Sequence, residues 1–452
     1  MRLLQKNGNS SEVCHATLNP AGPGAVRIFL IPPKRHLFSR APSVLILDGH
    51  FILPIGYSWA ILLGCFLNEI NQYKGNPIEQ TEFDAIITAA VESCRHRYRY
   101  TAASVLEGDL RQILKVLIDV AQGRTPDIDI GQLSLRQYAP HMTAPHRMDL
   151  LVSAMEKDGH WNCNQQCLHC YAAGQPASEA DELTTQQWKK MIDAYRAAGI
   201  PQLTFTGGEP TMRDDLPELV AHARWFITRL NTNGVRLTPE LCTSLRQAEL
   251  DSVQITLYSA DEAVHNRLVG AENFEKTVRG LQNALSAGLD VSVNTPLCTD
   301  NSDYGENLAF LHTLGVQYVS CSGLILTGNA TTEPSKETRL SPDALYEILK
   351  KATDFCAKND MEISFTSPGW LSAERLQALR LDVPVCGACL SNMATAPDGK
   401  VVPCQSWLSD NVSLGNALSD PWKHIWNHPA CKRIRAMGEE ESLLCLLREE
   451  KR

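Results

Sequence analysis

Three cysteines in the middle of the chain are spaced closely enough to share one metal centre. Cys163, Cys167 and Cys170 form a C-x3-C-x2-C pattern that reads as one loop. Three thiolates on one loop can hold three corners of an iron–sulfur cube and leave the fourth iron open for an exogenous ligand. A structural zinc site needs four protein ligands, and His169 cannot easily complete a tetrahedron with the cysteines beside it. The pattern therefore favours an iron–sulfur cluster over zinc and over chance burial of thiols.

A glycine-rich turn further along the chain could bind the ligand of that open iron. Gly207, Gly208 and Glu209 come directly after a short β-like run. Paired glycines at a strand end let a ligand approach the backbone closely. The carboxylate of Glu209 could pair with an ammonium group of the ligand. Alone, this sequence is also compatible with an ordinary turn, but together with the three cysteines it indicates a ligand site.

A second group of cysteines lies near the end of the chain. Cys386 and Cys389 precede an Asp-Gly turn between two short apolar runs, and Cys404 follows it. This pattern predicts a β-hairpin, and hairpin cysteines near a second loop suit a metal cluster. Spacing alone does not separate an iron–sulfur cluster from zinc held by four thiolates. After Cys404 the candidates for a fourth ligand are Cys445 and Cys431.

Size and composition limit the class of protein. The chain has 452 residues, enough for two or three domains, and a net charge of −9, which argues against sequence-independent nucleic-acid binding. No apolar run reaches the ~18–20 residues of a membrane span, and the N-terminus lacks the apolar core of a signal peptide. We therefore expect a cytoplasmic protein without a membrane partner. In a reducing compartment, clusters among its 15 cysteines suggest metal or redox chemistry.

The N-terminal part of the chain predicts a small α+β domain. Residues 1–25 read as a flexible arm, residues 26–122 as the domain and residues 123–147 as a linker. The domain's pattern predicts a strand at 26–31, a hairpin of 43–47 with 51–54 around an Asp-Gly turn, and helices near 57–71, 80–96 and 107–122.

The central part of the chain alternates strands and helices, a rhythm that implies a parallel sheet with its active site at the carboxyl ends of the strands. This region spans residues 148–330. A connecting segment with a helix and a strand, 331–382, joins it to the C-terminal region 383–452, which holds the second cysteine group. The predicted strands are 203–206, 225–230, 253–257, 291–293, 316–320 and 362–365; the predicted helices are 215–223, 239–249, 273–287, 306–314 and 342–357.

The central motifs resemble the radical S-adenosylmethionine (SAM) superfamily. The resemblance covers roughly residues 155–325 and rests on the cysteine triad followed by Tyr171, the Gly-Gly-Glu-Pro turn and Thr232-Asn233-Gly234. It implies a partial (βα)6 barrel in which Cys163, Cys167 and Cys170 hold a [4Fe–4S] cluster whose open iron binds SAM. The SAM-contacting residues that it implies are Tyr171, Gly207, Gly208, Glu209, Asn231, Asn233 and Thr256. In place of the His-x-x-x-Arg-Gly of relatives, this chain has Val269-Gly270, with Arg267 as a candidate substitute.

The C-terminal group resembles the SPASM/twitch extension of radical SAM enzymes. Cys389, Gly399 and Cys404 fit its C-x(9–15)-G-x4-C signature. A full SPASM domain holds two auxiliary clusters and needs more cysteines than this chain offers. The resemblance therefore implies one auxiliary [4Fe–4S] cluster, held by Cys386, Cys389, Cys404 and Cys445, with Cys431 as the rival fourth ligand and zinc as the chemical alternative.

The resemblance also implies a reaction. Reductive cleavage of SAM gives a 5′-deoxyadenosyl radical, which abstracts hydrogen from a substrate C–H bond, with electrons from a flavodoxin- or ferredoxin-type donor. The order of strands and helices in 26–122 is similar to the winged-helix peptide chaperones whose relatives bind a leader peptide as an edge strand. We therefore favour a maturase of a ribosomally made precursor peptide that forms a cross-link, thioether or related modification. The alternatives are oxidation or rearrangement of a small molecule or folded protein, as in cofactor or sulfatase maturation, and a non-catalytic metal protein.

Overall fold

The structure is a computed structural model. It describes residues 14–18, 26–31, 43–47, 51–72, 78–121, 124–128, 131, 133, 135–409, 412–440 and 444–447. The chain divides into two compact units, which are described separately below. One comprises Met1–Ala144 with Ala197–Pro201, and the other comprises Pro145–Arg196 with Gln202–Arg452.

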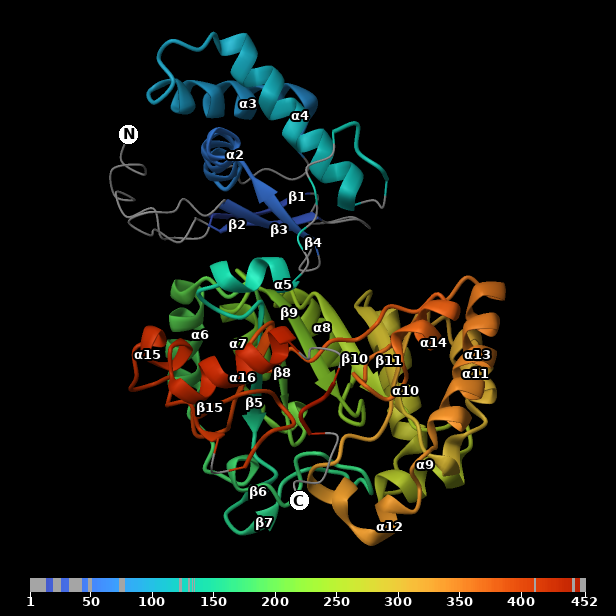
Figure 1. The fold of residues 1–452 in the computed structure, drawn as a ribbon. Helices are drawn as coiled ribbons and strands as arrows, with labels where there is room; N and C mark the ends of the chain where they lie inside the picture. Colours follow the sequence, from blue (N-terminus) through green and yellow to red (C-terminus); the bar gives the residue numbers. More distant parts are fainter. Residues whose placement is uncertain are drawn as a thin grey trace. The chain divides into compact units, whose positions relative to one another are not determined.

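The first unit contains a four-stranded antiparallel sheet in the order β1-β2-β3-β4 and three long helices. The helices lie on one face of the sheet, with α2 directly against it (Figure 1). The elements are β1 (Cys14–Leu18), β2 (Val26–Ile31), β3 (Ser43–Leu47), β4 (Phe51–Ile55), α2 (Tyr57–Ile70), α3 (Gln80–Arg95) and α4 (Ala103–Ala121). They enclose an apolar core that includes Ile28, Leu45, Phe66 and Leu110.

The sequence predicted this unit's strand, hairpin and three helices, and the structure confirms them. The interpretation of residues 1–25 as a loose arm is wrong for β1, whose residues Cys14–Leu18 pair with β2. Strand β1 was missed because Cys14–Leu18 has little of the apolar alternation that marks a half-buried strand. The predicted Asp48-Gly49 turn lies outside the described residues. Within the predicted linker the structure forms the short helices α5 (Leu135–Tyr138) and η1 (Ala139–His141).

The second unit is built on a mostly parallel sheet in the order β13-β12-β11-β10-β9-β8-β5-β14-β15. The first six parallel strands in chain order pair as sequential neighbours. They form the parallel sheet that the alternating pattern predicted and the partial barrel that the resemblance implied. Their bounds are β5 (Arg147–Ser153), β8 (Gln202–Gly207), β9 (Ile227–Thr232), β10 (Ser252–Thr256), β11 (Asp290–Pro296) and β12 (Tyr318–Ser322). The first of them, β5, and the helix α6 (Thr185–Ala198) that follows it were not among the predicted elements. The strand β13 (Glu362–Phe365) continues the sheet parallel to β12.

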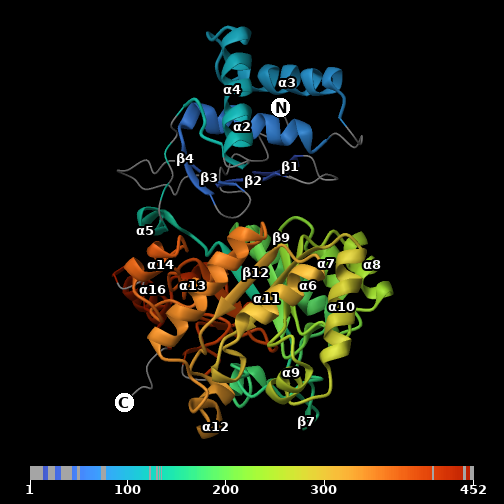
Figure 2. The same cartoon turned by 90° about the vertical axis from the view of Figure 1, so that its right-hand side faces the viewer.

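Helices cover the outer surface of this sheet (Figure 2). Along β10, Val253 and Ile255 are fully buried beneath them, whereas Gln254 and Thr256 point to the other side and are half-buried. The helices are α6 (Thr185–Ala198), α7 (Leu216–His222), α8 (Pro239–Gln247), α10 (Phe274–Ser286), α11 (Tyr304–Thr313) and α13 (Pro342–Lys358). Helices α8 and α13 begin as their sequences suggest, with a Thr238 or Ser341 cap followed by proline.

The C-terminal region joins the same sheet. Strand β14 (Asn392–Thr395) pairs in parallel with β5, and β15 (Val401–Val402) pairs with β14 around the predicted Asp398-Gly399 turn. Helices α14 (Ala373–Ala378), α15 (Trp422–Trp426) and α16 (Pro429–Glu440), which the sequence patterns did not predict, lie on either side of this hairpin in the chain. The second cysteine group is therefore attached directly to the first strand of the barrel.

Several connecting segments gather at the end of the sheet where the parallel strands terminate (Figure 1). They are the hairpin β6 (Glu156–Lys157) with β7 (His160–Trp161), the helix α9 (Glu262–Val269), and η5 (Gly328–Thr331) with α12 (Glu333–Lys336). These segments surround the loop that carries the cysteine triad. No helix in the described parts of the chain is long and apolar enough to cross a bilayer.

Candidate active site

The cysteine triad lies on the loop that follows β7, and its thiols are neighbours in space. Burial raises the pKa of Cys167, and the charges of Cys170 and Cys163 raise it further. Burial and the charge of Glu209 raise the pKa of Cys163 to about 12. The fold therefore brings the three predicted cluster ligands and the predicted ammonium-binding carboxylate together. Among the described residues, no three His, Cys, Asp or Glu side chains are arranged as the ligands of a metal ion.

Helix α9 and the residues after it hold one side of the cysteine loop. The backbone N–H of Gln166 donates to the carbonyl of Val269 at 2.9 Å, and that of Leu168 donates to Leu268 at 2.9 Å. Gly270 has a φ of +64°, and a Cβ there would lie 2.6 Å from the carbonyl oxygen of Gln166. The Val269-Gly270 segment thus fixes the loop through its backbone. Arg267 is 56% exposed and pairs with Asp300, on the surface rather than at this backbone contact.

We expect Gly270→Ala to displace the cysteine loop, since the new methyl group would overlap the backbone of Gln166 in a conformation that alanine rarely adopts. The expected cost is about 1–3 kcal/mol of stability. The Gly270→Ala substitution should also cause loss of iron at the triad, measured by iron counting after reconstitution. Gly288→Ala, which also has a positive φ but no atom within 4 Å of the added Cβ, controls for backbone strain alone. Equal iron loss in both variants would contradict the contact argument.

The segment after β12 holds the other side of the loop. Asn329 donates from Nδ2 to the carbonyl of Cys167 at 3.1 Å and from its backbone to Cys170 at 2.9 Å. The Nε2 of His169 lies 2.8 Å from Oγ1 of Thr338. Burial lowers the pKa of His169 to about 4, so its ring is neutral at pH 7. His169 therefore joins the loop to the segment after β12.

Glu209 is 1% exposed and is held by four hydrogen bonds. Its Oε1 accepts from the backbone and hydroxyl of Thr211, at 3.0 and 2.6 Å, and from Oγ1 of Thr232 at 2.6 Å. Its Oε2 accepts one bond, from the backbone of Asn233 at 2.8 Å. Burial raises its pKa despite these donors. Because each carboxylate oxygen has about two acceptor sites, Oε2 retains capacity for an ammonium donor.

The remaining predicted SAM residues lie at the ends of neighbouring strands. Asn233 donates from Nδ2 to Oδ1 of Asn164 at 2.6 Å, which ties the end of β9 to the residue after Cys163. Asn231 and Thr256 are half-buried on β9 and β10, and Gln254 stands in register with Asn231. The structure thus brings these residues to one side of the sheet, next to the cysteine loop.

The site offers unused polar atoms for SAM, and its two glycines pack closely against the last residue of β5 and the segment that follows it. Gly207 has a φ of +145°, and a Cβ there would lie 2.4 Å from the carbonyl oxygen of Ser153; at Gly208 it would lie 2.9 Å from that of Ala154. Three buried atoms around the turn and the loop have no hydrogen-bond partner in the described residues: Ser153 Oγ, Asn164 Nδ2 and Asn231 Oδ1. Such groups are normally satisfied. The residues present therefore fit a polar ligand on a three-thiolate cluster.

Tyr171 and Gln175 connect the triad to the second cysteine group. Tyr171 packs with Cys163 and Cys170 against a buried cluster that includes Leu151 and Leu408. The Nε2 of Gln175 donates to the carbonyls of Tyr171 and Ser406, the latter at 3.2 Å, and its Oε1 accepts from the backbone of Leu408 at 3.0 Å. One buried amide thus holds both cysteine-bearing segments.

The five C-terminal cysteines form two neighbouring sets. The charges of Cys386 and Cys445 both raise the pKa of Cys404, whose largest perturbation is burial. Cys389 contacts Cys431, and Arg435 lies 3.5 Å from the Cys431 sulfur. Cys389 is buried, with a φ of +55°, and also lies near Cys404. Cys386, Cys389 and Cys445 therefore all lie near Cys404, and the rival Cys431 is in contact with Cys389.

We expect Cys445→Ala to remove the auxiliary cluster and Cys431→Ala to leave it in place, because Cys445 stands with Cys386 and Cys404 while Cys431 contacts Cys389 and Arg435. Iron and sulfide analysis of the reconstituted proteins should show a loss of about four irons in the Cys445 variant. The reverse pattern would make Cys431 the fourth ligand. Loss of zinc instead of iron would identify a zinc site.

Residues that support the loop were missed by sequence reasoning. Asn273 donates from Nδ2 to the carbonyl of Asn164 at 3.1 Å, and Ser335 donates from Oγ to that of Leu168 at 2.7 Å. The side-chain amides of Gln175 and Asn329 also donate hydrogen bonds to backbone carbonyls of this segment, those of Tyr171 and Cys167. Amide and hydroxyl side chains are common at helix starts and turns, so no local signal distinguished these from ordinary caps.

The chain is similar to known iron–sulfur enzymes. Residues 162–311 match the radical SAM superfamily, and residues 386–446 match SPASM, an iron–sulfur cluster-binding domain. The mycofactocin maturase MftC of Mycolicibacterium smegmatis is 30% identical over 62% of this chain and 71% of its own length. The AdoMet-dependent heme synthase of Oleidesulfovibrio alaskensis is 27% identical over 59% of this chain and 72% of its own length.

Solved structures share the fold at low sequence identity. Streptococcus suis SuiB bound to its precursor peptide SuiA is 14% identical and covers 87% of each chain with a TM-score of 0.58. The enzyme anSMEcpe with bound AdoMet is 16% identical and covers 65% of this chain and 81% of its own, with a TM-score of 0.53. The matches to the two family models confirm the radical SAM barrel and C-terminal SPASM domain expected from the motifs, and with them the [4Fe–4S] cluster and SAM that these domains use. The chain belongs to the radical SAM superfamily and is an enzyme of its SPASM-containing branch.

Proposed function

We propose that this enzyme modifies a ribosomally made precursor peptide by forming a cross-link, thioether or related bond at a substrate carbon. The order of domains is the main support for this proposal. A small sheet-and-helix domain precedes a barrel, and the cysteine loop of the barrel is joined to a second cysteine group. The likeness to SuiB, at 87% of this chain, extends beyond the barrel and its C-terminal region. The maturase MftC supports the same assignment.

We assign the residues of this chain to holding the two clusters and SAM. Cys163, Cys167 and Cys170 hold the SAM-binding cluster, and Oε2 of Glu209 accepts from the ammonium group of SAM. When bound, the cluster and SAM supply a 5′-deoxyadenosyl radical that takes hydrogen from the substrate. The remaining SAM contacts come from the Gly207-Gly208 backbone and from Tyr171, Asn231, Asn233 and Thr256. Cys386, Cys389, Cys404 and Cys445 hold the auxiliary cluster, and Gln175 keeps the two cysteine-bearing segments in fixed register.

We assign residues 26–122 to recognition of the precursor's leader, 148–330 to the barrel and 383–452 to the auxiliary cluster. In the first unit an apolar cavity of about 220 Å³ lies between β4 and α4, bordered by Leu53, Trp59 and Ile113. Strand β4 is at the edge of its sheet, and Pro54 is the kind of residue that such an edge accommodates. The backbone N–H of Leu133 donates to the carbonyl of Ile52 on this edge, at 2.8 Å. An extended leader could pair with the rest of the edge, or displace Leu133, and place an apolar side chain in the cavity.

Leader binding is testable by fluorescence polarisation with a labelled precursor peptide. Trp59→Ala should weaken binding roughly 10-fold or more, as expected for an aromatic anchor in a pocket. Tyr57→Ala changes an aromatic residue on the same helix that is 57% exposed, and it should bind normally. Equal affinity of the Trp59→Ala and Tyr57→Ala variants for the leader would rule out this cavity as the leader-binding site.

The substrate class is tested by coexpression with a small open reading frame encoded beside this gene, followed by mass spectrometry of the peptide. A mass loss of about two hydrogens that depends on Cys163, Cys167 and Cys170 would support the proposal. An unmodified peptide together with active SAM cleavage would favour a small molecule or folded protein, the alternative to which the heme synthase relative points. We further propose a flavodoxin- or ferredoxin-type electron donor and the reducing cytoplasm as the compartment.

A further inference from the structure

A cavity of about 160 Å³ lies at the carboxyl ends of strands β11 and β12, outside the residues assigned to SAM. Most of the side chains that line it are apolar, and they come from segments that follow β11, β12 and β13: Leu297, Leu324, Leu326, Leu340 and Trp370. Gly323 makes room for the indole, because a Cβ there would lie 2.1 Å from Cδ1 of Trp370. A cavity of this size holds a group as large as a benzene ring.

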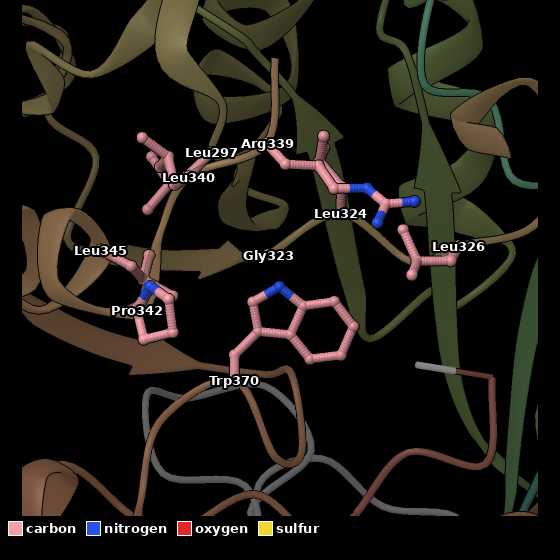
Figure 3. A pocket seen from close by; sticks show the side chains of 9 residues that line it. All are labelled: Leu297, Gly323, Leu324, Leu326, Arg339, Leu340, Pro342, Leu345 and Trp370. Carbon is pink, nitrogen blue, oxygen red and sulfur yellow. The ribbon is translucent and has the colours of Figure 1, made fainter. Parts of the chain in front are cut away.

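One charged side chain enters this apolar space. Figure 3 shows the guanidinium group of Arg339 reaching toward Leu326, with the indole of Trp370 on the other side of the cavity. The Nε and Nη2 atoms of Arg339 are buried and have no hydrogen-bond partner in the described residues. Leaving buried donors of a cation unpaired is costly, and such groups are normally matched by an anion. A guanidinium in this state fits a carboxylate.

Segments that line the cavity contact the cysteine loop and Cys445. Leu324 belongs to a buried cluster against which Cys167 and Leu168 pack. In the turn that carries Trp370, the carbonyl of Pro368 accepts a hydrogen bond from the backbone of Cys445 at 3.3 Å. A group held here would therefore lie beside the segments that carry both proposed clusters.

The position of Arg339 is fixed by the cysteine loop. Its neighbour Thr338 is hydrogen-bonded to His169 at 2.8 Å, and the carbonyl of Thr338 accepts from the backbone of Thr299 at 2.8 Å. The guanidinium is thus held relative to the triad by the same segment that supports the loop.

We propose that this cavity binds a carboxylate-bearing residue of the substrate, with its apolar part against Trp370 and the leucines and its carboxylate on Arg339. This inference rests on the proposed peptide-modifying function and specifies which part of the substrate is recognised. A carboxylate could come from the substrate or from the methionine part of SAM. We assign the site to the substrate, because the residues assigned to SAM lie at the ends of β8 to β10 or, for Tyr171, on the cysteine loop, whereas this cavity follows β11 to β13.

The test uses 19F NMR of 4-fluorophenylacetate and its neutral amide, 4-fluorophenylacetamide, titrated into the reconstituted enzyme. The carboxylate should bind roughly 10- to 100-fold more tightly than the amide, as expected when a charged donor gains a partner. Arg339→Met should abolish that preference and Arg339→Lys should keep part of it. Arg375→Met, which removes an exposed arginine paired with Asp343, should behave as the wild type.

Addition of saturating SAM separates the two sources of carboxylate. Continued binding of the probe supports a substrate subsite, whereas displacement by SAM would assign Arg339 to the SAM carboxylate and overturn the proposal. Equal binding of acid and amide by the wild type, or an unchanged preference in Arg339→Met, would also overturn it. Because the titration uses no peptide, its result is independent of whether a precursor peptide is the substrate.

Discussion

Replacing Cys163, Cys167 and Cys170 together by alanine should abolish SAM cleavage and remove about half of the iron that the reconstituted enzyme binds. With one cluster at each cysteine group, the wild type should hold about eight irons and the variant about four. The three thiols are neighbours on one loop, so their removal leaves no ligand for the SAM-binding cluster. Iron and sulfide counting under anaerobic conditions, together with assay of 5′-deoxyadenosine, measures both effects.

The matched control replaces Cys242 and Cys356, buried cysteines on α8 and α13, by alanine. It should retain both clusters and SAM cleavage at some cost in stability, as expected for small buried side chains. About four irons in the wild type and none in the triad variant would mean that the C-terminal cysteines hold zinc or nothing. That result would contradict the proposal of an auxiliary iron–sulfur cluster.

Glu209→Gln should weaken SAM binding by roughly 10- to 100-fold, the range expected when a charged hydrogen-bond partner is lost. The substitution removes the negative charge that faces the SAM ammonium group. Oε1 accepts three donors, so the new amide nitrogen is best tolerated at the Oε2 position, where it would face the backbone N–H of Asn233 and break that bond. Equilibrium binding of SAM to the reconstituted variant measures the loss.

Glu218→Gln on α7 is the matched control, since Glu218 is 54% exposed and pairs with Lys189 on the surface. It should bind SAM as the wild type does, because surface ion pairs contribute little. Wild-type affinity in the Glu209 variant would show that the carboxylate serves only to brace the end of β9 through Thr232 and Asn233.

Short-range patterns in the sequence identified the centre of the site. The spacing of the triad and the Gly207-Gly208-Glu209 turn are local features, and the strand before the turn follows from an apolar run between turn residues. For the same reason the alternating order of strands and helices was predictable, although several predicted element boundaries differ from the observed ones by a few residues. The predicted strand 225–230, for example, begins at Ile227 because the N–H of Phe226 closes a turn onto Ala223. The strands β5 and β7, which precede the triad, were not predicted.

Long-range contacts account for what could not be predicted. The overlap that a side chain at Gly270 would have with Gln166, and the link from His169 to Thr338, join segments far apart in the sequence. The Arg339 cavity is assembled from segments after three strands, and nothing in the sequence around Trp370 indicated that its indole packs on Gly323. Such contacts depend on the register between elements, which composition and periodicity do not encode.

The pairing of β14 with β5 has a consequence for how the protein is made. Strand β5 begins at Arg147, but its partner Asn392–Thr395 is synthesised about 240 residues later in the chain. At roughly 5–20 residues per second, the ribosome leaves this edge of β5 without its partner for tens of seconds. An open strand edge invites pairing with other chains. The nascent barrel is therefore most prone to aggregation before its C-terminal hairpin emerges, and chaperone binding during translation should protect that interval.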